Sequence, residues 1–348
     1  MKKDILSMTL TELTGEIERL DLPKYRAAQI YRWLHKAGVS DFSQMTDLSL
    51  DLRSRLNDNF VIFTCNIEKK LISEYDGTVK YLFSLHDGEF IESVVMKYKY
   101  GYTVCVSSQV GCRMGCRFCA STLSGVVRNL EPAEILSQVY AAERDLDVRI
   151  SHVVMMGMGE PLDNFDNVMR FLTLITDENG KNISMRHISL STCGIVPGIN
   201  ALAEKDLQLT LSVSLHAPNN EIRSAMMPVN KKWPVESLIA ACKAYTEKTS
   251  RRISFEYALV AGRNDTPACA KELAALLRGM LCHINLIPVN EVEETGCEES
   301  KPEDIKKFCD ILSGKGFAVT VRRRLGSDIN AACGQLRRSA VRKQKETP

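Results

Sequence analysis

Three cysteines in the first half of the chain have the spacing of a metal-binding loop. Cys112, Cys116 and Cys119 form a C-x3-C-x2-C motif, and a strand-like run precedes it. Cysteine thiolates hold iron–sulfur clusters, and a cubane cluster normally takes four of them. Three ligands therefore leave one iron open to a ligand from outside the protein. Structural zinc, the alternative, needs four closed ligands, usually in two separated pairs. The motif thus favours an iron–sulfur site over zinc.

The elements that must position this loop alternate between strands and helices. The expected strands are Thr103–Ser107, His152–Met156, His187–Ser191, Leu209–Leu215, Ile253–Val260, Ile284–Pro288 and Phe317–Val321. A helical stretch follows each of the first six, which implies a parallel sheet with right-handed crossovers. Six units fall short of a closed eightfold barrel, so we expect an α/β fold with an incomplete (β/α)6 barrel. In such folds the chemistry collects in the loops that follow the strands.

The chain divides into three expected parts. Residues 1–98 are expected to form a small N-terminal accessory domain, 99–325 the barrel, and 326–348 a C-terminal segment. The accessory domain is either an RNA-docking module or a plain packing domain. Its helices and strands are expected at Leu6–Leu20, Tyr25–Lys36, Asp47–Phe60, Cys65–Leu71, Thr78–Leu85 and Glu89–Lys97.

Composition narrows the class of protein. The 348 residues include 45 basic and 43 acidic side chains, a net charge of +2. This balance excludes a strongly basic nucleic-acid coat protein and an acidic disordered chain. We expect neither a signal peptide nor a membrane span, because no apolar run is long enough. Twelve cysteines then fit a cytoplasmic, reducing setting, where clustered cysteines bind metal or react.

Basic residues are concentrated near the C-terminus. Between Val321 and Pro348 there are eight basic and two acidic residues. A solvated tail is one interpretation of such a run, and an RNA-facing segment is the other. Cys333 lies between two groups of arginines, Arg322–Arg324 and Arg337–Arg338, in a stretch that contains glycine. Cationic surroundings favour a reactive thiolate, although a lone cysteine is more often inert packing.

Four motifs together make the chain resemble a known family. They are Gln109-Val110-Gly111 with the cysteine loop, Met156–Pro161 (MGMGEP), Ser214–Ala217 (SLHA) and Gly326–Leu336 (GSDINAACGQL). The chain resembles radical S-adenosylmethionine (SAM) enzymes, and among them the RNA adenine-C2 methyltransferases of the RlmN type, over nearly its whole length. The resemblance implies a partial β/α barrel, one 4Fe–4S cluster on the three cysteines, and SAM on the open iron.

Polar residues at or just beyond the strand ends are the expected SAM contacts. Any one of them alone would more often be a satisfied loop or core residue. Their shared location favours a common ligand, and the resemblance implies SAM contacts at the matching positions. These are Gly159, Glu160, Ser191, Ser214, Leu215, His216 and Asn290.

The resemblance also implies a mechanism with three catalytic residues. Carbon 2 of adenine and the SAM methyl group are both electrophilic, so direct displacement cannot join them. The family uses two SAM molecules per turnover, one to methylate Cys333 and one to give a radical that activates that methyl group. Glu92 then removes the carbon-2 proton, and Cys105 releases the product by forming a transient disulfide with Cys333. Apart from the resemblance, Cys105 would be core packing and Glu92 a solvated strand residue.

The resemblance implies partners as well. They are 23S rRNA, tRNA beside the anticodon, and an electron donor such as flavodoxin or ferredoxin, with the enzyme a monomer. Two alternatives stay open: an adenine carbon-8 methyltransferase of the Cfr type, and a non-catalytic, metal-bearing RNA-binding protein. Of the remaining cysteines, Cys193 follows a barrel strand and lies nearest the expected cofactor region.

Overall fold

A sheet of ten strands forms the main body of the computed structural model, which describes residues 2–289, 296–329, 331, 336–338 and 340–341. Its strand order is β14-β13-β12-β11-β10-β9-β6-β5-β4-β3. Seven consecutive strands of this sheet are parallel to one another. They are β6 (Gly101–Cys105), β9 (Ile150–Met155), β10 (Ile188–Thr192), β11 (Thr210–Ser214), β12 (Ile253–Leu259), β13 (Cys282–Pro288) and β14 (Val319–Val321). The six expected β/α units and the last strand are confirmed.

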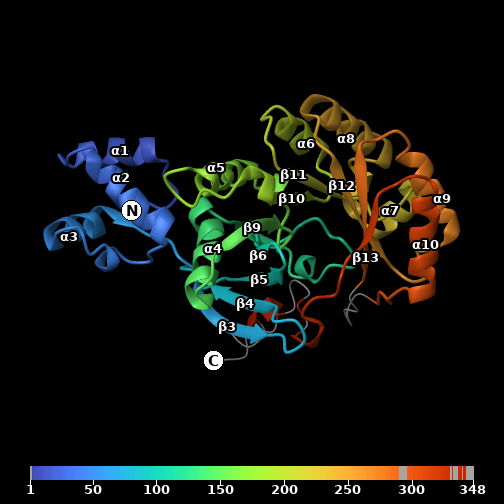
Figure 1. Ribbon diagram of the computed structural model, residues 1–348, viewed down its shortest axis with the longest axis horizontal. Coiled ribbons are helices and arrows are strands. Elements are labelled where there is room, and N and C mark those ends of the chain that lie inside the picture. Colours follow the sequence, from blue (N-terminus) through green and yellow to red (C-terminus); the bar gives the residue numbers. More distant parts are fainter. Residues whose placement is uncertain (1, 290–295, 330, 332–335, 339, 342–348) are drawn as a thin grey trace.

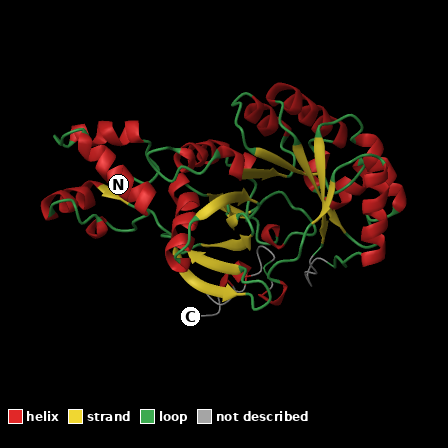
Figure 2. Ribbon diagram, viewed as in Figure 1, coloured by secondary structure: helices red, strands yellow, loops and turns green. Residues whose placement is uncertain are grey.

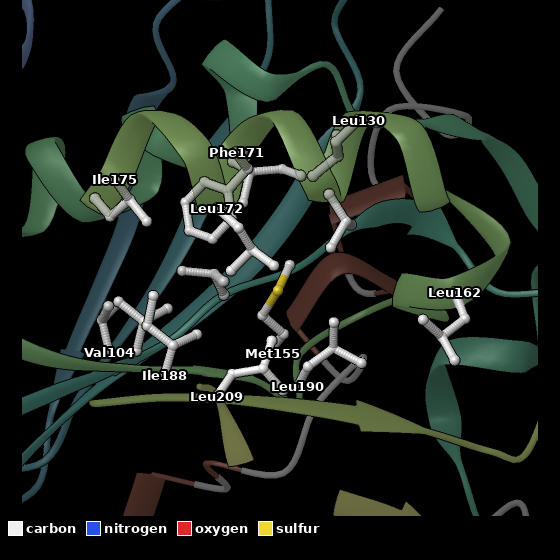
Figure 3. Close-up of a cluster of buried hydrophobic side chains, with 14 of the residues drawn as sticks. Val104, Leu130, Met155, Leu162, Phe171, Leu172, Ile175, Ile188, Leu190 and Leu209 are labelled. Carbon is white, nitrogen blue, oxygen red and sulfur yellow. The ribbon is translucent and has the colours of Figure 1, made fainter. Parts of the chain in front are cut away.

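Helices cover the outer face of this sheet (Figure 2). They are α4 (Pro132–Leu146), α5 (Phe165–Thr176), α6 (Val196–Ala203), α8 (Val235–Thr249), α9 (Pro267–Leu276) and α10 (Pro302–Gly314). The short helix α7 (Asn220–Met226) lies instead at the carboxyl ends of β10 and β11. Figure 3 shows the core beneath α5, where Phe171 and Leu172 meet Met155 and Leu190 from the strands. In β10, Leu190 alternates with Ser191, which lines a cavity. Alternation along the strands therefore places apolar residues against the helices and polar ones inside the barrel.

Three antiparallel strands extend the barrel sheet on the side of the N-terminus. They are β3 (Asn66–Ile72), β4 (Val79–Ser84) and β5 (Phe90–Tyr98). β5 forms a hairpin with β6, in which Val94 pairs with Cys105. The expected domain boundary at residue 98 falls inside this hairpin, so the sheet is continuous across it. A two-residue connection can join only antiparallel neighbours, which explains why the pairing changes from parallel to antiparallel between β6 and β5.

The first sixty residues form a helical lobe at one end of the molecule (Figure 1). It contains α1 (Leu10–Arg19), α2 (Tyr25–Arg32), α3 (Leu50–Asn59) and the short pair β1 (Lys3–Asp4) and β2 (Phe60–Val61). α1 begins at a capping box between Thr9 and Glu12. Several contacts attach the lobe to the barrel. Among them, the Tyr31 hydroxyl donates to Asp177 at 3.1 Å, and His35 Nδ1 lies 3.2 Å from the Tyr140 hydroxyl.

The chain after β14 returns across the sheet to the β3–β4 turn. Asp328 accepts hydrogen bonds from the Ser73 hydroxyl at 2.7 Å and the Glu74 amide at 2.8 Å. Asp76 in the same turn accepts from the Gly326 amide at 2.8 Å. These contacts place the start of the expected C-terminal segment beside the mouth of the barrel. Among the described residues, no helix is both long and apolar enough to span a bilayer.

Candidate active site

The carboxyl ends of the parallel strands surround a cavity of about 730 Å³. The cavity brings together most residues that the sequence singled out, although they come from elements far apart in the chain. Leu215 is fully buried beside it. Asn290 and Cys333 lie outside the described residues. The expected site residues that line the cavity are Glu92, Cys105, Cys112, Cys116, Cys119, Gly159, Glu160, Ser191, Ser214 and His216.

A small hairpin that sequence analysis missed holds the cysteine loop. It consists of β7 (Gln109–Gly111) and β8 (Val126–Asn129). The Cys112 amide donates to the Gly125 carbonyl at 3.0 Å, which closes the base of the loop. Gly111 has a φ of +80°, and a Cβ there would lie 1.9 Å from the Gly125 carbonyl oxygen. Only glycine can therefore make this approach.

The three thiols of the loop have the chemistry of cluster ligands. Burial raises the pKa of Cys112 to about 12 and raises the pKa of Cys116 and Cys119 as well. For Cys116, the two other thiols raise the pKa further after burial, because thiolates this close repel each other. In the described part of the chain, no three potential ligands converge on a point as the ligands of a single ion would. Three buried thiols facing one cavity fit a cationic iron–sulfur core, which would offset their mutual repulsion.

Glu160 is held rigidly at the wall of the cavity. Its carboxylate accepts from the Cys193 amide at 2.7 Å and the Leu162 amide at 3.0 Å. Its own amide donates to the side chain of Gln109 at 2.9 Å. Burial raises the pKa of the carboxyl group, with these hydrogen bonds acting in the opposite direction. A fixed carboxylate of this kind suits an ammonium group.

Gly159 permits the close packing beside Glu160. Its φ is +102°, and a Cβ there would lie 2.7 Å from the Gln109 amide nitrogen and 2.8 Å from the Ser108 hydroxyl. Any side chain would thus displace β7, the strand that leads into the cysteine loop.

His216 connects the end of β11 to the cysteine loop. Its ring lies edge-on to the Phe118 ring, with 4.8 Å between centroids. Its Nδ1 accepts from the Ala258 amide at 2.8 Å. Burial lowers the pKa of the imidazole to about 3, so His216 is neutral at pH 7 and can donate a hydrogen bond only from Nε2.

Glu92 and Cys105 lie on neighbouring strands, β5 and β6, and both face the cavity. Glu92 forms a buried ion pair with Lys80, with 2.9 Å between Oε2 and Nζ. Its other oxygen accepts from the Arg337 amide at 2.7 Å. Burial raises the pKa of the Cys105 thiol, and the charge of Arg322 partly offsets this effect.

Several residues that shape the site were not predicted from the sequence. Lys80 lies in the middle of an apolar strand, where no pattern links it to Glu92. Glu256 in β12 lines the cavity and accepts from Ser254 at 2.9 Å and Asn285 at 2.7 Å. The sequence did offer a signal for Glu256, because it is an acidic residue within the largely apolar strand β12. Cys193 does border the site, as its position after β10 suggested.

Two protein-family models match this chain, one over the helical lobe and one over the barrel. The Radical SAM superfamily model matches residues 106–277. The model of the Ribosomal RNA large subunit methyltransferase N-terminal domain matches residues 3–62. The helical lobe and the barrel therefore each resemble a described domain.

Relatives match along the whole chain. A Clostridium novyi (strain NT) protein named "Probable dual-specificity RNA methyltransferase RlmN" is 54% identical over 340 residues, 98% of this chain and 99% of that protein. A protein of the same name from Alkaliphilus oremlandii (strain OhILAs) is 52% identical over 337 residues, 97% of this chain and 98% of that protein. The crystal structure of a radical SAM methyltransferase from Sphaerobacter thermophilus has 42% identity and a TM-score of 0.92, covering 96% of this chain and 98% of that one.

Proposed function

Because this chain belongs to the RlmN family of radical SAM RNA methyltransferases, we propose that it methylates carbon 2 of adenine in 23S rRNA and in tRNA beside the anticodon. That it is a radical SAM RNA methyltransferase follows from the family, and this excludes the non-catalytic alternative. The observation that carries the finer proposal is the single cavity that joins the cysteine loop, Glu92 and Cys105.

The proposed cofactor residues follow the wall of the cavity. Cys112, Cys116 and Cys119 hold the 4Fe–4S cluster of the superfamily. Bound together, the cluster and SAM supply the one-electron chemistry that makes a methyl group reactive toward carbon 2. The SAM-binding residues in this proposal are Gly159, Glu160, Ser191, Ser214, Leu215, His216 and Asn290.

Each SAM-binding group has a definite task. Glu160 accepts from the amino group of SAM, and His216 donates from Nε2 because its Nδ1 is already occupied by the Ala258 amide. Ser191 and Ser214 offer hydroxyl groups from adjacent strands. The apolar core behind these strands keeps the residues fixed while two SAM molecules bind in succession.

The proposed covalent chemistry uses two cysteines, Cys333 and Cys105. Cys333 carries the methyl group as S-methylcysteine and becomes bonded through that carbon to adenine carbon 2. Gly326, Ser327 and Ala331, which precede Cys333 in the chain, line the cavity and support this assignment. Cys105 then attacks the Cys333 sulfur, so that the sulfur–sulfur bond forms as the sulfur–carbon bond breaks. The carbon leaves with the electron pair and takes up a proton to become the methyl group of the product, and a cellular dithiol reductant reopens the disulfide.

Glu92 is the proposed base for the carbon-2 proton. Its carboxylate is buried, faces the cavity and is kept in place by Lys80 and the Arg337 amide. A general base must lie within hydrogen-bond reach of the proton it removes. Glu92 and Cys105 lie on adjacent strands of the same cavity wall, which supports their assignment as base and second thiol.

RNA is proposed to approach over the basic side of the mouth. Arg322, Arg323 and Arg324 border the cavity, where their charges can contact phosphates. The target adenine must leave its stack to reach the interior. In this proposal the accessory part, residues 1–98, helps to dock RNA, residues 99–325 form the catalytic barrel, and residues 326–348 carry the methyl. The enzyme acts as a cytoplasmic monomer with a flavodoxin or ferredoxin as electron donor.

Mapping the product on RNA tests the proposal. Purified enzyme with a reconstituted cluster, SAM and reductant is incubated with unmodified rRNA and tRNA, and methylated adenines are located by mass spectrometry. We expect 2-methyladenine in both RNAs. Methylation only at carbon 8 would assign the chain to the Cfr-type activity instead, and methylation of rRNA alone would remove the tRNA part.

A further inference from the structure

Arg223 on α7 is a fully buried arginine directly behind the candidate cofactor site. Its guanidinium donates to three backbone carbonyls of the cavity wall: Cys193 at 2.6 Å, Ser214 at 3.1 Å and Leu215 at 3.1 Å. A fourth hydrogen bond, of 3.1 Å, goes to the side chain of Asn230. The guanidinium thus fastens the end of β10 to the end of β11.

The same helix also holds the cysteine loop. The Arg117 amide, one residue after Cys116, donates to the carbonyl of Met226 at the end of α7 at 2.9 Å. A backbone hydrogen bond therefore fixes α7 relative to the loop, and the hydrogen bonds of the guanidinium fix the cation relative to the ends of β10 and β11.

The charge of Arg223 has no carboxylate partner among the described residues; only carbonyl and amide oxygens accept from it. Burial lowers the pKa of the guanidinium, and the thiols of Cys193, Cys116 and Cys242 are the groups that act against this effect. A buried charge without an opposite charge is strongly unfavourable. Behind the cysteine loop, which α7 contacts, the protein therefore holds a buried cation that lacks an opposite charge among the described residues.

We propose that Arg223 is the counter-charge of the thiolate-bound cluster and favours its reduced state. This inference rests on the proposed function, in which Cys116 is a cluster ligand. Reduction by one electron adds a negative charge at the site without adding a proton. A cation fixed nearby in a poorly solvated interior stabilises the more negative state, because solvent screens the interaction little. Arg223 is thus a positioning residue with an electrostatic effect.

The reduction potential of the bound cluster tests this role. Wild type, Arg223→Lys, Arg223→Met and Arg223→Gln are reconstituted anaerobically with iron and sulfide, and the potential is measured by titration followed by electron paramagnetic resonance. We expect Arg223→Met and Arg223→Gln to shift it to more negative values by about 59 mV or more, a tenfold change for one electron. Arg223→Lys should remain close to wild type, because it keeps the charge while losing most of the hydrogen bonds.

A control separates charge from general damage. Arg251 donates to the Leu209 carbonyl at 3.4 Å at the opposite ends of the strands, so Arg251→Met should leave the potential unchanged. If the two neutral variants bind no cluster while Arg223→Lys does, the charge is still supported. Loss of the cluster in all three variants, or an unchanged potential in a neutral one, overturns the inference. Failure of the wild type to bind a cluster would instead contradict the proposed function.

Discussion

At the scale of single residues, burial decides what each charged group in the site can do. Glu92 and Lys80 form a pair that is almost completely shielded from solvent. Removing one member of such a pair leaves an uncompensated charge and typically costs about 3–5 kcal/mol. The pair is therefore a rigid part of the wall, and the carboxylate of Glu92 faces the reacting space from a fixed position.

Replacing Glu92 by glutamine should stop the reaction after the RNA has become attached. If Glu92 removes the carbon-2 proton, the adduct between Cys333 and RNA cannot be resolved and accumulates, which a denaturing gel detects as a protein–RNA band. Glu89, whose carboxylate pairs with Arg337 at 3.0 Å, offers a control, and Glu89→Gln should turn over without the band. Normal methylation by a folded Glu92→Gln enzyme would contradict the role of base.

Gly159 tests how tightly the SAM site is packed. In Gly159→Ala the new Cβ would displace Gln109, which holds the Glu160 amide, so we expect SAM affinity to fall about tenfold or more, measured by calorimetry on the reconstituted protein. Gly262 has a φ of +67° but nothing within 4 Å of its Cβ position. Gly262→Ala likewise puts a side chain on a residue of positive φ, but without the close contacts of Gly159→Ala. Its SAM affinity should be unchanged, and equal losses in both variants would show that strain alone is responsible.

At the scale of elements, the attachment of the helical lobe to the barrel depends on a buried histidine. α2 continues into a π-helical turn, Trp33–Ala37, which ends at Gly38 with a φ of +67°. The wider turn places His35 against Tyr140 of α4 and beside Tyr31. The imidazole is fully buried, and burial lowers its pKa to about 3, so the lobe packs only with His35 neutral.

Acid should therefore weaken the folded state through His35. The unfolded chain binds a proton near pH 6.5, whereas folded His35 stays neutral until about pH 3, so its stabilising contribution is complete above pH 6.5 and declines as the pH falls. By pH 5 the loss is on the order of 2 kcal/mol, measured as the free energy of unfolding in urea. His216 adds a similar dependence. His35→Gln should thus reduce the slope of the free energy of unfolding against pH by the equivalent of up to one bound proton. A slope equal to that of wild type would contradict the assignment.

At the scale of the whole molecule, the net charge is close to zero, but the basic residues are unevenly distributed. The basic residues Arg322–Arg324 lie at the mouth of the cavity, and Asp328 fixes the chain just beyond them to the β3–β4 turn. The positive charge of these arginines thus lies at the mouth of the cavity, where RNA is proposed to enter.

RNA binding should depend on salt through these arginines. Replacing Arg322 and Arg323 by alanine should weaken binding to all RNA sequences alike and reduce the slope of log affinity against log salt by about 0.7–0.9 for each lost phosphate contact. Fluorescence anisotropy with labelled RNA measures the slope. Lys306 and Lys307, exposed on α10, provide the matched double alanine control, which should keep the wild-type slope. If both double variants gave the same slope of log affinity against log salt, Arg322 and Arg323 would not contact the RNA phosphates.

Local patterns were enough to predict the repeating β/α units and to single out the cysteine loop. The spacing of Cys112, Cys116 and Cys119 reflects one loop, and the alternation of strands and helices reflects hydrophobic periodicity, so both can be found along the chain. The rule that loops after parallel strands meet at one end then places Glu160, Ser191 and His216 together, as the cavity shows.

Only the tertiary structure decided which distant residues become partners. The pairing of Lys80 with Glu92, the docking of Asp328 on the β3–β4 turn, and the extension of the barrel sheet by β3–β5 depend on contacts between segments that no local pattern relates. Arg223 is the sharpest example, because a charged residue on a short helix normally faces water. Its burial follows from four hydrogen bonds to groups that fold around it, and these exist only once β10, β11 and α7 have packed.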